Sequence, residues 1–262
     1  MRFAINHISA PKLSLAEFFA MCRRLGVSEV EIRNDIPDVL GTMSAAAVRA
    51  EAAAQGITIL SINALYPFNL WSGDLPDRAL RMADYAAECG AQALVMCPLN
   101  DGQKVAHSRV VEALDAMTPI LKTRGLTGLV EPLGFPISSL RTKAEAIAAM
   151  TEADEDGTYL LMHDTFHHHL AGETVFYPNR TGLVHISGVT DPAVAVDDML
   201  DAHRVLVDGA DRLENIEQIR ALQAGGYAGP FSFEPFAQQV HDLDDPEAAL
   251  RESMDHIRAA LA

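Results

Sequence analysis

Short apolar segments alternate along the chain with segments whose apolar positions recur three and four residues apart. The first pattern predicts buried strands and the second predicts amphipathic helices. The predicted strands cover residues 2–8, 30–32, 57–63, 93–97, 126–131, a stretch beginning at Leu160, 183–187 and 231–234. The predicted helices cover residues 15–25, 45–55, 75–88, 106–122, a short stretch after 142, 213–224 and 246–261.

Helix boundaries mark a repeating unit of strand and helix. Capping boxes stand at Ser14–Glu17 and Thr142–Glu145. Glycines that end predicted helices recur every 30 to 35 residues, at Gly26, Gly56, Gly90 and Gly125. Strands that alternate with helices form a parallel sheet, and eight such units build a (β/α)₈ barrel. We therefore expect one α/β domain over residues 1–262, a single TIM barrel.

A doubly wound open sheet is the alternative fold. It would normally carry a glycine-rich phosphate loop after its first strand. That position holds residues 6–11, Asn-His-Ile-Ser-Ala-Pro, without a glycine, and the chain contains neither Gly-x-Gly-x-x-Gly nor a Walker A sequence. The barrel is therefore favoured.

Composition and charge restrict the classes of molecule that the protein could bind. The 262 residues are 49% hydrophobic and carry a net charge of −16, which repels nucleic acid phosphates. Three distant cysteines without a CxxC motif indicate reduced thiols. No secretory signal pattern and no apolar run of about 18 residues is found. We expect a cytoplasmic protein that acts on a small molecule, with no nucleic acid or membrane partner; the sequence leaves homo-oligomerisation open.

The predicted strands end in polar or reactive residues, and the carboxyl ends of barrel strands are where catalytic groups lie. Three carboxylates and one imidazole that converge there would need a cation to offset their repulsion. Oxygen ligands with one nitrogen suit Mn²⁺, Mg²⁺ or Co²⁺, with Zn²⁺ as a further candidate. The strand-end residues are His7, Arg33, Asn63, Cys97, Glu131, Asp164, His185 and Glu234.

Glu131 and Glu234 share a further feature, because each precedes a proline and then an apolar residue. A residue before proline is biased towards extended backbone, which fixes the direction in which its side chain leaves the strand. Two such glutamates on strands five and eight are placed to flank a substrate from opposite sides.

Taken in order, the motifs Val-Glu131-Pro, Asp164-x-x-His167, Leu-Val-His185-Ile-Ser and Phe-Ser-Phe-Glu234-Pro-Phe resemble the xylose-isomerase-like TIM-barrel superfamily, over essentially the whole chain. The nearest branch looks like the inosose (2-keto-myo-inositol) isomerases, which implies a role in inositol catabolism. By this resemblance, one divalent cation, most simply Mn²⁺, is held by Glu131, Asp164, His185 and Glu234, and His167 contacts the substrate.

One position departs from the resemblance. Epimerases of this group carry an arginine six residues after the metal-binding histidine, where this chain has Asp191. Arg204 is the candidate to take its place.

Other residues keep two interpretations. His7 contacts the substrate or caps the barrel, and Arg33 binds substrate hydroxyls or pairs with Glu31. Trp71 belongs, with Tyr66 and Phe68, to a lid over the substrate or to a hydrophobic plug. His163 faces the helix layer because it precedes Asp164 in the strand. His168 and His169 begin a helix or meet solvent. The expected substrate-binding set is His167, His7, Arg33, Asn63, Trp71 and Arg204.

These features predict a metal-dependent isomerase or epimerase of a keto-cyclitol or keto sugar. The cation would acidify the C–H bond between a carbonyl and a hydroxyl and stabilise an enediolate, while Glu131 and Glu234 transfer the proton. An inosose dehydratase begins with the same step and remains an alternative. A phosphodiesterase of the endonuclease IV type would need about three metals and a basic groove, which the charge disfavours. None of the four lysines ends a strand, which argues against Schiff-base chemistry.

Overall fold

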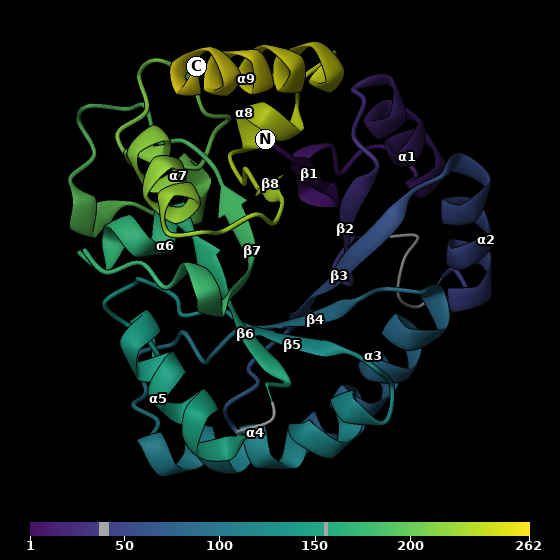
Figure 1. Ribbon diagram of the computed structural model, residues 1–262, viewed down its shortest axis with the longest axis vertical. Coiled ribbons are helices and arrows are strands. Elements are labelled where there is room, and N and C mark those ends of the chain that lie inside the picture. The colour runs from purple at the N-terminus through teal and green to yellow at the C-terminus, as the bar shows by residue number, and fades with distance from the viewer. Residues whose placement is uncertain (37–41, 155–156) are drawn as a thin grey trace.

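The computed structural model, which describes residues 1–36, 42–154 and 157–262, is a single (β/α)₈ TIM barrel. Its parallel strands pair in chain order, and the last strand pairs with the first to close the barrel (Figure 1). This confirms the predicted fold. The strands are β1 (Phe3–Asn6), β2 (Glu29–Arg33), β3 (Thr58–Leu65), β4 (Ala93–Met96), β5 (Thr127–Val130), β6 (Tyr159–Asp164), β7 (Thr181–Ile186) and β8 (Phe231–Phe233).

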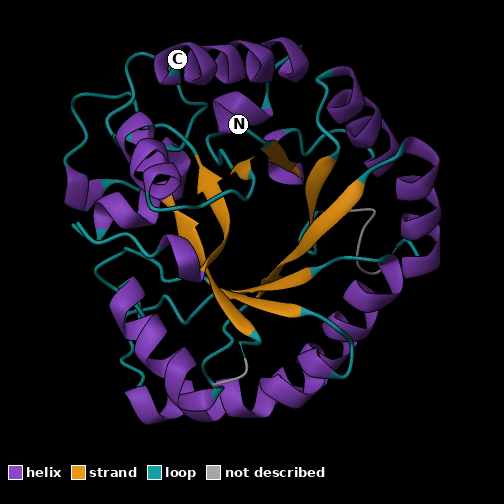
Figure 2. Ribbon diagram, viewed as in Figure 1, coloured by secondary structure: helices purple, strands orange, loops and turns teal. Residues whose placement is uncertain are grey.

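The helices form an outer ring around the strands (Figure 2). Two of them, α6 and α8, are short and lie at the carboxyl ends of β6 and β8. The helices are α1 (Leu15–Arg24), α2 (Ala45–Gln55), α3 (Leu75–Cys89), α4 (His107–Lys122), α5 (Lys143–Ala153), α6 (Thr165–Leu170), α7 (Asn215–Ala224), α8 (Gln238–His241) and α9 (Pro246–Leu261).

Local sequence accounts for the helix ends. Both expected capping boxes form, at the starts of α1 and α5. Gly56 and Gly90 end α2 and α3 with φ of 64° and 85°, a left-handed conformation that glycine adopts without steric cost. Each of these helix-ending glycines thus marks the end of the helix in one βα unit.

Apolar packing divides into a barrel interior and a shell between strands and helices. The interior group includes Ala4, Val95, Leu129, Met162 and Leu183, all buried. Because successive strand residues point to opposite faces, residues two positions further along a strand point to the same interior. This parity carries the polar groups at the carboxyl ends of the strands into the mouth of the barrel.

Two segments differ from expectation. The first strand ends at Asn6, and residues His7–Ser9 form a short 3-10 helix instead of extending the strand. The long connection after β7 contains two 3-10 turns, Val196–Asp198 and Asp201–His203, and its Gly188 pairs with Val205. This connection brings Arg204 over the carboxyl face of the barrel.

Candidate metal centre and substrate cavity

Four buried side chains meet at the carboxyl ends of β5 to β8. Leu129, Met162 and Leu183 belong to the barrel interior, so Glu131, Asp164 and His185 two residues later point inward as well. Glu234 reaches the same place from the end of β8. One ligand atom from each of Glu131, Asp164, His185 and Glu234 lies within 4.8 Å of the other three.

His185 lies at the centre of this cluster. Its Nδ1 is 3.1 Å from Glu234 Oε2, 3.2 Å from Glu131 Oε1 and 3.8 Å from Asp164 Oδ2. Its other ring nitrogen, Nε2, lies 3.0 Å from Oε1 of Glu31 on β2. A carboxylate accepts only, so Nε2 donates to Glu31. Nδ1 donates to the other three carboxylates while it is protonated, and it would offer its lone pair to a cation that takes the place of this proton.

These donors fit a divalent cation. A metal-binding histidine typically donates its second ring N–H to a carboxylate, which is what Glu31 provides. Burial opposes protonation of the imidazole, but the charges of Glu234 and Glu31 outweigh it and raise the pKa of His185 well above its ordinary value. A site that attracts a proton so strongly favours a metal cation too, and the two compete for Nδ1.

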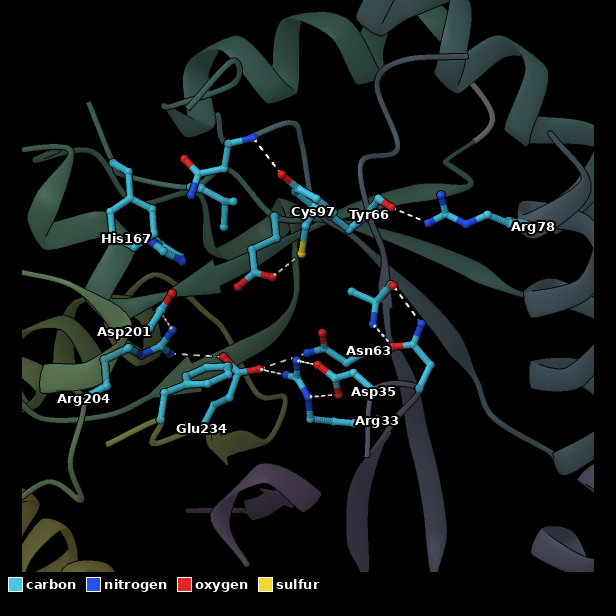
Figure 3. A pocket seen from close by; sticks show the side chains of 17 residues that line it. Arg33, Asp35, Asn63, Tyr66, Arg78, Cys97, His167, Asp201, Arg204 and Glu234 are labelled. Carbon is cyan, nitrogen blue, oxygen red and sulfur yellow. Dashed lines mark hydrogen bonds and ion pairs between the residues drawn. The ribbon is translucent and has the colours of Figure 1, made fainter. Parts of the chain in front are cut away.

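Two arginines form ion pairs with Glu234 from opposite sides (Figure 3). Arg33 Nη1 is 3.2 Å from Oε1, and Arg204 Nη2 is 3.1 Å from Oε2 and 2.6 Å from Asp164 Oδ2. Burial alone would raise the pKa of Glu234, but His185 and the two arginines hold it below its ordinary value. The Glu234 carboxylate is therefore ionised and held in one orientation.

Asp164 also has backbone donors, and Glu131 contacts a thiol. Oδ1 of Asp164 accepts the backbone N–H of Phe166 at 2.7 Å and of His167 at 3.4 Å, which caps α6. Oε2 of Glu131 lies 3.1 Å from the Cys97 thiol. Burial and the nearby charge of Glu131 raise the pKa of Cys97 well above its ordinary value, so the thiol is protonated and donates.

A cavity of about 510 Å³ opens above the cluster. Glu131 and Glu234 line it, while Asp164 and His185 are buried and are not among its lining residues. The volume suits a small ligand. Its wall also includes Arg33, Asn63, Tyr66, Cys97, His167, Arg204 and Phe236.

The sequence comparisons agree with this geometry. A family model described as "Xylose isomerase-like TIM barrel" matches residues 19–260. The chain belongs to the xylose isomerase-like TIM barrel family. No curated relative matches the sequence significantly.

Solved structures superpose over the whole barrel. A xylose isomerase domain containing protein from Salmonella typhimurium LT2 is 35% identical, with a TM-score of 0.92 over 99% of this chain and 97% of that one. The zinc-bound IolI protein is 20% identical, with a TM-score of 0.88 over 100% and 98% of the two chains. The D-psicose 3-epimerase of Clostridium cellulolyticum H10, solved with D-tagatose, is 16% identical, with a TM-score of 0.76 over 100% and 99%.

Within the described residues, no helix has the length and apolar character that a membrane span requires.

Most of the expected substrate-binding residues of this family member reach the cavity. His167, Arg33, Asn63 and Arg204 all line it. Arg33 pairs with Asp35, at 2.7 and 2.8 Å, and with Glu234, rather than with Glu31 as one interpretation had it.

Two residues of that set lie elsewhere, so their assignment as substrate contacts is corrected. His7 is buried against α1, donating from Nε2 to the Leu13 carbonyl at 3.0 Å and stacking on Phe18, because the chain leaves the strand one residue before it. Trp71 packs against the shell core. Tyr66 takes its place at the cavity mouth.

The adjacent histidines serve the helix layer. His163 points away from the barrel, as expected, and its Nε2 lies 3.0 Å from Gln218 Oε1 on α7. His168 lies in helix α6, as the first of its two interpretations stated; it is buried rather than exposed to solvent and accepts from Lys143 Nζ at 2.5 Å. Lys143 also pairs with Glu173 at 2.7 Å.

Glu31 is the functional residue that sequence reasoning missed. Its carboxylate is buried and accepts from Ser61, Ser232 and His185. A signal was present, because Glu31 and Arg33 are two residues apart and therefore share a face of β2. Arg33 at the active face thus implied Glu31 inside the barrel.

Proposed function

We propose that this protein is a divalent-metal-dependent isomerase or epimerase of a small keto-cyclitol or keto sugar, with an inosose as the leading candidate. One observation carries the proposal: of the four clustered residues, which could hold a metal, the two glutamates also line the cavity. The likeness to IolI and to D-psicose 3-epimerase supports the substrate class.

A bound cation would polarise a carbonyl and a neighbouring hydroxyl oxygen and so acidify the C–H bond between them. Glu131 and Glu234 directly follow β5 and β8, so each is placed to accept or return a proton from its own side of the substrate. His167 and Arg204 line the cavity and supply N–H donors for substrate oxygens.

Cluster size argues against a phosphodiesterase. Such an enzyme of the endonuclease IV type would need about three ions, and the described residues contain one group of potential ligands. The net charge of −16 also disfavours a DNA substrate.

The test combines metal content with turnover. Wild-type protein, loaded with Mn²⁺ and assayed on inososes, ketohexoses and hydroxypyruvate, should bind one ion per chain and isomerise one of these classes. His185→Ala should lose the ion and some thermal stability together, because a metal bound only by the folded state stabilises it.

Equal metal content in wild type and His185→Ala, by elemental analysis, would exclude the site. Release of water from an inosose, without an isomeric product, would replace the isomerase by the dehydratase.

A further inference from the structure

Cys97 stands at the mouth of the barrel without a part in the chemistry described so far. It follows β4, where its backbone N–H donates to Leu65 at 3.1 Å and its carbonyl accepts from Phe68 at 3.0 Å. The next residue is Pro98, which biases Cys97 towards an extended backbone. The direction of the side chain is therefore fixed by its surroundings, and it lines the cavity (Figure 3).

The two carboxylate oxygens of Glu131 have different neighbours. Oε1 lies 3.2 Å from His185 Nδ1, on the side of the metal centre, and Oε2 lies 3.1 Å from the Cys97 sulfur. Among the hydrogen bonds of the described residues, the Cys97 thiol provides the contact to Oε2.

The other carboxylates of the cluster are held by more donors. Oε1 of Glu234 accepts from Asn63 at 3.0 Å, Asn6 at 3.1 Å and Arg33 at 3.2 Å. By comparison, Oε1 of Glu131 contacts His185 alone, and Oε2 has a single donor, the Cys97 thiol. The terminal torsion of a glutamate is broad and roughly two-fold, so a carboxylate without that donor rotates readily.

We propose that Cys97 is a positioning residue that holds the Glu131 carboxylate with Oε1 towards His185 and Oε2 towards the cavity. This inference rests on the proposed function, because it assumes that Glu131 both binds the cation and transfers a proton. It adds to that function by naming the group that leaves Oε1 of Glu131 for the cation and Oε2 for proton transfer.

A purely packing role for Cys97 makes a different prediction. If the thiol only fills space, Cys97→Ala and Cys97→Ser should behave alike, or the serine should be worse because its hydroxyl is more polar. If the thiol positions Glu131, Cys97→Ser keeps a donor and retains function, whereas Cys97→Ala loses the donor.

The experiment compares wild type, Cys97→Ala, Cys97→Ser and the control Cys89→Ala, a buried cysteine at the end of α3. With Mn²⁺ saturating, we expect kcat of Cys97→Ala to fall about tenfold, the effect of one hydrogen bond, with KM nearly unchanged. Cys97→Ser should stay within about threefold of wild type. Cys89→Ala should lower Tm by packing loss but keep kcat.

A second readout does not depend on turnover. Co²⁺-loaded proteins should show a changed visible absorption spectrum in Cys97→Ala and a spectrum close to wild type in Cys97→Ser. Equal kcat and equal spectra for the two variants would overturn the positioning role while leaving the isomerase standing. A wild type that turns over no substrate, but whose Co²⁺ spectrum separates the two variants, would overturn the proposed function and uphold the positioning role.

Discussion

Replacing Glu31 with glutamine should weaken metal binding without dismantling the barrel. The Glu31 carboxylate accepts three donors: Ser232 Oγ at 2.5 Å, Ser61 Oγ at 2.7 Å and His185 Nε2 at 3.0 Å. A glutamine of the same size offers one acceptor oxygen and one donor NH₂, so one of these contacts becomes unfavourable unless a hydroxyl rotates. The imidazole is then no longer held with its Nδ1 lone pair towards the metal ligands.

The size of the effect follows from that lost orientation. Removing a group that orients a metal-binding histidine typically lowers metal affinity 10- to 100-fold, about 1.4 to 2.7 kcal/mol. Glu31 is fully buried, so solvent cannot replace the missing acceptor. We expect the Mn²⁺ dissociation constant of Glu31→Gln to rise within this range.

The assay is calorimetric titration of chelator-treated protein with Mn²⁺ at constant pH. Glu29→Gln is the matched control, because Glu29 lies on the same strand but pairs with Arg2 at the other end of the barrel, where the pair contributes little. A dissociation constant for Glu31→Gln within twofold of wild type, with both proteins folded by circular dichroism, would refute the orientation argument.

Two further variants test other parts of the structure. His167→Ala should retain the cation but lose much of kcat/KM, because the side chain lines the cavity outside the ligand cluster; a metal loss matching that of His185→Ala would mean that the two histidines are exchanged. Burial and the Lys143 charge lower the pKa of His168 to about 3, so between that value and about 6.5 the unfolded chain binds one more proton and stability falls as pH falls. His168→Gln should therefore reduce the pH slope of the unfolding free energy in urea between pH 4 and 6, by up to about 1.4 kcal/mol per pH unit, and an unchanged slope would contradict the buried neutral imidazole.

Much of the fold could be predicted from the sequence, because local sequence features define each βα unit. Capping boxes and helix-ending glycines act within a few residues, so the elements could be placed from the sequence with errors of one or two residues at most ends. The strand-end carboxylates were also predictable, because parity and the following prolines fix where Glu131 and Glu234 point.

Contacts between distant segments could not be read in this way. His7 was assigned to the cavity because the first strand was expected to run to residue 8, two residues beyond its end at Asn6, and the packing against Phe18 places His7 beside α1 instead. The packing of Trp71 and the ion pair between Arg204 and Asp164 both depend on the path that the long connections take over the barrel. Glu31 became recognisable as the partner of His185 only when β2 and β7 were seen to face each other across the interior.

The central claim is that a proton leaves the substrate and returns through Glu131 and Glu234 beside a bound cation. The most direct measurement is turnover of the accepted keto substrate in D₂O by Mn²⁺-saturated enzyme, with metal occupancy measured for wild type, Glu131→Gln and Glu234→Gln. We predict deuterium on the product carbon beside the carbonyl, because a carboxylate exchanges its proton with solvent, and a rate loss of at least about 100-fold in either variant at full occupancy. An unlabelled product together with near-normal rates in both variants would contradict the two-glutamate mechanism and indicate internal hydride transfer.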